Sequence, residues 1–155
     1  MVCYCKRSFF TIKKFAVDYS VVPWCTYTDP ELARVGLSED EAKARNIPHE
    51  VTTYGLDDLD RAITDRTDYG KVKVVTPPGK DKILGTAICG VHAGDLLAEF
   101  TLAMKQGIGL NKILGTIHPY LTLSEASKML AGAWRKNNAP AVVLHFLERF
   151  HSWRR

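Results

Sequence analysis

The residues whose types and spacing best suit chemistry lie together in residues 118–125, which read HPYLTLSE. This segment brings the imidazole of His118, the phenol of Tyr120 and the carboxylate of Glu125 onto one loop and the start of a helix. All three groups can exchange protons with a substrate, and an imidazole does so close to neutral pH. The alternative is structural. Thr122-x-x-Glu125 is a capping box that alone accounts for Glu125, and the other two side chains are then ordinary loop residues.

A second pair of candidates is Cys3-x-Cys5 near the start of the chain. Two thiols this close are typical of a redox or metal-binding pair. A terminal tail with incidental cysteines is the favoured interpretation, because no histidine or further cysteine lies nearby in the sequence. The histidines include no pair spaced four residues apart, so no metal site is predicted; they are His49, His92, His118, His145 and His151.

Sequence motifs that hold a cofactor or activate a nucleophile are missing from these 155 residues. There is no Gly-x-Gly-x-x-Gly dinucleotide fingerprint, no P-loop and no Gly-x-Ser-x-Gly turn. We therefore expect this chain alone to bind no cofactor.

Composition excludes several further classes of protein. With 46% hydrophobic and 25% charged residues the chain has the composition of a globular protein. Residues 1–14 carry four bases and no acid, which accounts for the net charge of +4 and leaves no basic body for nucleic acid. No apolar run approaches the roughly 20 residues of a membrane span. Four irregularly spaced cysteines make no disulfide framework, so we expect a cytoplasmic protein, with a mitochondrial presequence as the alternative.

The elements that must position the candidate residues mix strands and helices. Ser38-x-x-Glu41 is a capping box that predicts a helix over about residues 39–45, and Asp29-Pro30-Glu31 has the form of a helix start. The other predicted elements are strands at 21–28 and 50–54, helical turns at 56–63, a hairpin of 71–76 with 82–91, a helix through 96–104 ended by Gly107, a helix after 122–125 and an amphipathic extension at 139–155. This order predicts an α+β fold, an antiparallel sheet of about four to five strands with helices packed on one side.

Six segments, in this order along the chain, carry a family resemblance: 28–38 (TDPELARVGLS), 60–62 (DRA), 70–74 (GKVKV), 82–85 (KILG), 93–99 (AGDLLAE) and 116–126 (TIHPYLTLSEA). On them the chain resembles the C-terminal interface (dimerisation) domain of the pyridine nucleotide–disulfide oxidoreductases. These flavoproteins include dihydrolipoamide dehydrogenase, glutathione reductase and mercuric reductase. The resemblance covers residues 20–137 as the domain, with 1–19 as a tail and 138–155 as a C-terminal extension.

The resemblance implies an intact enzyme that uses FAD and NAD(P), in which the last loop of one subunit reaches the partner's flavin and dithiol. In the family a His, hydrogen-bonded to the Glu five residues later, is the acid–base group; here that position is Tyr120. The resemblance thus implies Tyr120, His118 and Glu125 as catalytic residues, and His118 and Pro119 as cofactor-binding residues. The Pro-Tyr-Leu-Thr sequence is closest to mercuric reductase, although no cysteine follows Glu125. A phenol in place of imidazole favours an acceptor other than a simple disulfide, such as a metal ion or a quinone.

The partners implied by the resemblance are a second copy of the chain and the FAD and NAD(P) domains. In the family the sheet face and the helix around residues 96–104 form a two-fold interface, so we expect a homodimer that lacks reductase activity on its own. One alternative is a stand-alone homodimerising interaction module without a catalytic role. Another is a small thiol or metal protein that uses Cys3 and Cys5.

Overall fold

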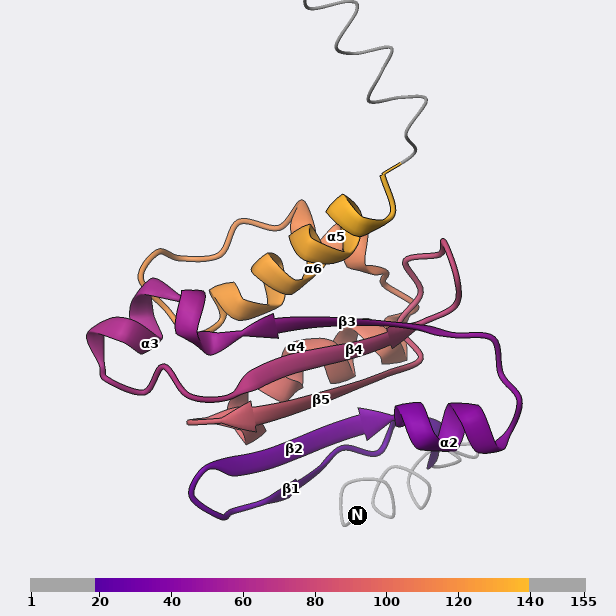
Figure 1. The fold of residues 1–155 in the computed structure, drawn as a ribbon, viewed down its shortest axis with the longest axis horizontal. Coiled ribbons are helices and arrows are strands. Elements are labelled where there is room, and N and C mark those ends of the chain that lie inside the picture. Colours follow the sequence, from indigo (N-terminus) through magenta and orange to yellow (C-terminus); the bar gives the residue numbers. More distant parts are fainter. Residues whose placement is uncertain (1–18, 140–155) are drawn as a thin grey trace, which may run out of the picture.

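The structure, a computed structural model, describes residues 19–139 (Figure 1). Its strands are β1 (Trp24–Thr26), β2 (Glu31–Gly36), β3 (Glu50–Gly55), β4 (Lys71–Thr76) and β5 (Gly85–Gly90). Its helices are α2 (Glu39–Ala44), α3 (Asp60–Thr64), α4 (Ala93–Gln106), α5 (Leu110–Leu114) and α6 (Glu125–Asn137), with short 3-10 helices η1 (Tyr19–Val21) and η2 (Leu56–Asp58).

The five strands form one antiparallel sheet in the order β1-β2-β5-β4-β3. Its register places Ala33, Ile88 and Val72 in one row across β2, β5 and β4. All three side chains are almost fully buried. Because side chains alternate between the two faces of a strand, these rows define one buried face of the sheet.

Helices α4 and α6 cover that face (Figure 1). α4 packs on β2 and β5 and contributes the buried Leu97 and Phe100, whereas α6 packs on β3 and β4 and contributes Leu130 and Trp134. The predicted α+β architecture with helices on one side is confirmed. The helix predicted at about residues 39–45 is α2, but it lies over one end of the opposite face, a position that the sequence did not predict.

One carboxylate fixes the far end of α6 to the sheet. Glu50 Oε1, at the start of β3, accepts hydrogen bonds from Trp134 Nε1 at 2.8 Å, Asn138 Nδ2 at 3.0 Å and Thr76 Oγ1 at 3.2 Å. These donors come from the end of α6 and from β4, so the bonds hold two layers of the fold in register.

The local predictions had different outcomes. The capping box at Ser38 and Glu41 is confirmed, and α4 ends at Gly107, whose φ of 66° favours glycine. The helix start at Asp29-Pro30-Glu31 is wrong, because this segment turns from β1 into β2. Asp-Pro is equally typical of a turn, and pairing β2 with β5 buries alternate side chains that a helix would leave exposed. The extension at 139–155 and the cysteine pair lie outside the described residues, and the proposed domain boundaries stay a prediction.

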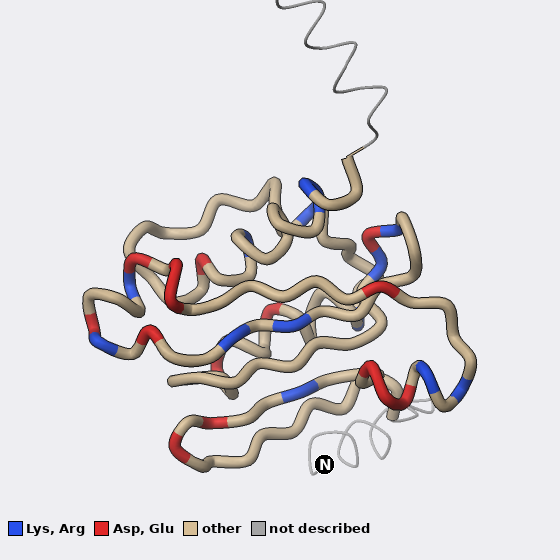
Figure 2. Tube along the Cα trace, viewed as in Figure 1, with Lys and Arg blue, Asp and Glu red and all other residues tan. Residues whose placement is uncertain are grey.

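α2 is attached to the open face of the sheet by ion pairs. Arg34 and Lys73 flank Ala87 on this face, and they bind Glu41 and Glu39 of α2 respectively. Glu39 also pairs with Lys43 at 2.6 Å. The hydrogen bonds and charges of Lys43 and Lys73 lower the pKa of Glu39 to about 2. Figure 2 shows how acidic residues gather in the first turn of this helix.

The Glu39 ion pairs predict an acid sensitivity. A carboxylate whose pKa is lower in the folded than in the unfolded chain stabilises the fold above the unfolded value, about 4.3, and loses this contribution as the pH falls toward about 2. We expect the free energy of unfolding of Glu39→Gln to fall less between these pH values than that of the unaltered chain. Urea titrations at several pH values measure this, with Asp40→Asn as the control in the same helical turn. Equal pH dependence in the unaltered and Glu39→Gln chains would contradict it.

Candidate functional site

The candidate residues lie on the loop of residues 115–124, which connects α5 to α6. α5 packs directly on α6, and α6 is fixed to the sheet through Glu50. Both ends of the loop are therefore attached to the core, and its conformation is set by contacts from three other elements.

His118 faces inward, toward α4. Its side chain is only 6% exposed, with Nε2 lying 2.9 Å from Glu99 Oε1 and Nδ1 lying 3.1 Å from the carbonyl oxygen of Thr116. A carbonyl can only accept, so the ring nitrogen facing Thr116 carries a hydrogen. The contact with Glu99 joins the loop to the middle of α4. The sequence did not single out Glu99, because its partner is 19 residues away and no local pattern connects them.

Tyr120 faces outward and is 75% exposed. Its hydroxyl donates a hydrogen bond to Asp60 Oδ2 of α3 at 3.3 Å. The negative charge of Asp60 raises the pKa of Tyr120 first, followed by this hydrogen bond, by burial and by the charge of Glu125. A phenol whose pKa is raised stays protonated at neutral pH. Tyr120 is therefore a hydrogen-bond donor rather than a base.

Glu125 is 8% exposed and begins α6, but the predicted capping box is only half formed. Its Oε2 accepts from the backbone N–H of Thr122 at 3.3 Å, as the box requires. The hydroxyl of Thr122 instead donates to the carbonyl oxygen of Pro119 at 2.8 Å and contacts the Ser124 hydroxyl at 2.7 Å. The reciprocal bond is thus missing and Ser124 takes the N-cap position, so Thr122 was wrongly predicted as the cap.

The structure brings the three predicted residues onto one loop but turns them in different directions. His118 bonds to α4, Tyr120 to α3, and Glu125 to the backbone of its own loop. The negative charge of Glu125 contributes to the raised pKa of Tyr120, but the hydroxyl of Tyr120 donates its hydrogen bond to Asp60. Within residues 19–139, no cluster of three His, Cys, Asp or Glu side chains is placed to hold a metal ion, and no helix is long and apolar enough to span a bilayer.

Comparison with known proteins gives a consistent result. Residues 22–131 match the family profile described as pyridine nucleotide-disulphide oxidoreductase, dimerisation domain. A dihydrolipoyl dehydrogenase of Buchnera aphidicola subsp. Acyrthosiphon pisum is 43% identical over 114 residues, which are 74% of this chain and 24% of that protein. A mercuric reductase of Streptomyces lividans is 35% identical over 115 residues, again 74% of this chain and 24% of that protein.

Solved structures share the fold. The flavoprotein disulfide reductase RclA of Escherichia coli superposes with a TM-score of 0.77 at 20% identity, covering 84% of this chain and 30% of that one. LpdA of Mycobacterium tuberculosis superposes with a TM-score of 0.72 at 21% identity, covering 77% of this chain and 26% of that one. The chain spans about a quarter of the length of the curated relatives that it matches.

The pair of Glu99 and His118 predicts how firmly the loop is held. Glu99→Ala removes a hydrogen bond between potentially charged partners, worth about 1.5 kcal/mol. We expect amide hydrogen exchange in residues 116–123 to become at least tenfold faster, because local opening of the loop becomes easier. Glu99→Gln keeps an acceptor oxygen and should exchange much more slowly than Glu99→Ala. Unchanged exchange in Glu99→Ala would show that this pair does not hold the loop.

Proposed function

This chain belongs to the pyridine nucleotide-disulphide oxidoreductase family, whose dimerisation domain it carries, and from this premise we propose how it acts in an intact enzyme. It pairs two subunits of an FAD-dependent oxidoreductase, and its loop of residues 115–124 completes the active site of the partner subunit. Its partners are a second copy and the flavin and nicotinamide domains, with no role for nucleic acid or a membrane.

The main support for this proposal is the loop of residues 115–124, which is fixed to the domain on one side and exposed to solvent on the other. His118 is buried against Glu99, and Thr122 bonds back to Pro119. Ile117 and Tyr120, in contrast, are 93% and 75% exposed. A loop that holds apolar and aromatic side chains out into solvent at fixed positions is suited to complete a site that lies mainly on another subunit.

The residues of this loop fit a flavin that is held elsewhere. FAD, when bound, supplies the electron transfer between the nicotinamide and the dithiol. Pro119 is exposed and free to contact such a group, whereas His118 would take part through its backbone, because its ring is occupied by Glu99. The sequence carries no dinucleotide fingerprint, so FAD and NAD(P) belong to the other domains of the enzyme.

The chemistry proposed for the loop is hydrogen-bond donation by Tyr120. Asp60 orients its hydroxyl and keeps it protonated. This property suits an electron acceptor that gains from a donor, such as a quinone or the ligands of a metal ion, better than a dithiol that must lose a proton. Glu125 fixes the loop through Thr122 and adds negative charge behind Tyr120.

We place the enzyme in the cytoplasm. The cysteines of the described residues, Cys25 and Cys89, are both free thiols. Cys25 lies on β1 and Cys89 on β5, with β2 between them, and both are partly buried. Unpaired thiols of this kind suit a reducing compartment.

The proposed dimer surface is the outer side of α4. This helix buries Leu97, Phe100 and Ala103 on one side, yet Leu102 on its other side is 59% exposed. Such a residue favours contact with a second copy of the same helix across a two-fold axis. The open face of the sheet also exposes Leu32, at 44%, but there the charged Arg34 and Lys71 lie alongside it.

We expect the chain to be a dimer at tens of micromolar, and Leu102→Glu to raise its dissociation constant at least tenfold. The reason is that the substitution removes apolar area from both halves of the interface and places two like charges together. Sedimentation equilibrium measures the constant. Leu32→Glu is the matched control on the open face and should change it much less. A monomeric unaltered chain, or dissociation by Leu32→Glu alone, would contradict this surface.

Tyr120→Phe tests the chemistry in the intact enzyme. Loss of one useful hydrogen bond, about 1.4 kcal/mol, should lower turnover with the native acceptor at least tenfold. His118→Ala should act mainly by loosening the loop. Unchanged turnover in Tyr120→Phe together with a large loss in His118→Ala would assign the acid–base role to His118 instead.

A further inference from the structure

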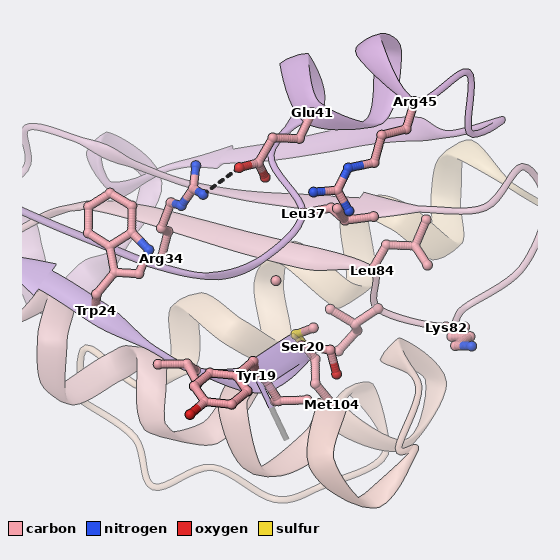
Figure 3. A pocket seen from close by; sticks show the side chains of 14 residues that line it. Tyr19, Ser20, Trp24, Arg34, Leu37, Glu41, Arg45, Lys82, Leu84 and Met104 are labelled. Carbon is pink, nitrogen blue, oxygen red and sulfur yellow. Dashed lines mark hydrogen bonds and ion pairs between the residues drawn. The ribbon is translucent and has the colours of Figure 1, made fainter. Parts of the chain in front are cut away.

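A cavity of about 660 Å³ opens on the side of the domain where α2 meets β1 and β2 (Figure 3). None of the residues that line it belongs to the loop of residues 115–124. Its walls come from η1, β1, β2 and α2, together with Met104 of α4 and the segment 82–84 that precedes β5.

The cavity has an excess of positive charge. Arg34, Arg45 and Lys82 line it together with one carboxylate, Glu41, so three positive charges and one negative give a net charge of +2. Figure 3 shows the guanidinium group of Arg45 reaching into the space from α2. Within the part of the chain that the structure describes, neither Arg45 nor Lys82 forms an ion pair.

Glu41 does not compensate these two cations, because both of its oxygens are occupied. Oε1 accepts from Arg34 Nη2 at 2.8 Å, and Oε2 accepts from the backbone N–H of Ser38 at 2.8 Å. These bonds lower the pKa of Glu41, so it is a carboxylate at neutral pH. The carboxylate of Glu41 is therefore already bound by Arg34 and by the N-terminal cap of α2.

Arg34 has a buried donor without a partner in the described part of the chain. Its guanidinium group stacks over the ring of Trp24, 4.7 Å from the ring centroid, and Nη2 binds Glu41. Its Nε is buried and has no hydrogen-bond partner within the described residues. A buried donor without an acceptor is costly, so the residues around Arg34 satisfy its guanidinium group only in part.

The rest of the lining is apolar and aromatic. Ile83, which is 5% exposed, Leu84 and Met104 are part of this lining. The rings of Tyr19 and Trp24 also line the cavity (Figure 3).

We propose that this cavity binds a small organic anion, in which a phosphate or carboxylate meets Arg34, Arg45 and Lys82 and an aromatic or apolar body rests against Trp24 and Ile83. Arginine suits such a group because its planar fork presents several donors to the oxygens of one anion. The site lies apart from the loop that carries Tyr120, so its occupancy does not depend on the function proposed above.

Phenyl phosphate, benzoate and inorganic phosphate are the probes, titrated into the full chain and followed by calorimetry and by amide chemical shifts. We expect phenyl phosphate to bind at least tenfold more tightly than inorganic phosphate, and to shift amides in residues 19–24, 34–45 and 82–84. Comparison of phenyl phosphate with benzoate identifies which anionic group the site prefers.

Arg45→Gln combined with Lys82→Gln should weaken phenyl phosphate binding at least tenfold, and both positions are exposed, so the fold should be retained. Arg66→Gln combined with Lys112→Gln removes the same two charges elsewhere and should leave binding within twofold. Failure of the unaltered chain to bind phenyl phosphate or benzoate at millimolar concentration, or equal weakening by both double variants, would overturn the site. Equal affinity for inorganic and phenyl phosphate would overturn the role of the apolar lining.

Discussion

The structure depends on the packing of two helices against a single face of the sheet. Rows of small and branched side chains, such as Ala33, Ile88 and Val72, form a surface on which Phe100 of α4 and Leu130 of α6 are buried. The segment that connects α4 to α6 must then span the distance between these two packed helices. The loop that carries the candidate residues occupies this connection, so its place follows from the core rather than from its own sequence.

Polar contacts refine that placement. Glu50 holds the end of α6 on the sheet, and Glu99 holds the loop on α4. Each carboxylate lies where two layers meet and binds donors from another layer. Both carboxylates are partly buried, and such groups are costly unless their partners are in position. They therefore favour one arrangement of the layers over near alternatives.

Local signals in the sequence predicted those features whose partners are also local. The capping box at Ser38 needs only Glu41, and the end of α4 needs only Gly107, so both could be found from spacing. Asp29-Pro30 is ambiguous between a turn and a helix start, and only the pairing of β2 with β5 decides it. Within the site the family resemblance identified the loop and Tyr120; Asp60 and Glu99 lie in matching segments, but no pattern in the sequence indicated a role for them in the site. These partners are 60 and 19 residues away, and chain folding alone brings them near.

The strand order has a consequence for how the chain folds. β4 and β5 are close in sequence, as are β1 and β2, so each pair can form early with little loss of chain entropy. The central contact between β2 and β5 joins residues as distant as Glu31 and Gly90. The intervening segment contains α2, β3, α3 and β4, so this pairing closes a long loop of chain. Because folding rate falls as the sequence separation of contacts grows, we expect closure of β2 against β5 to be the late, slow step that unites two local units.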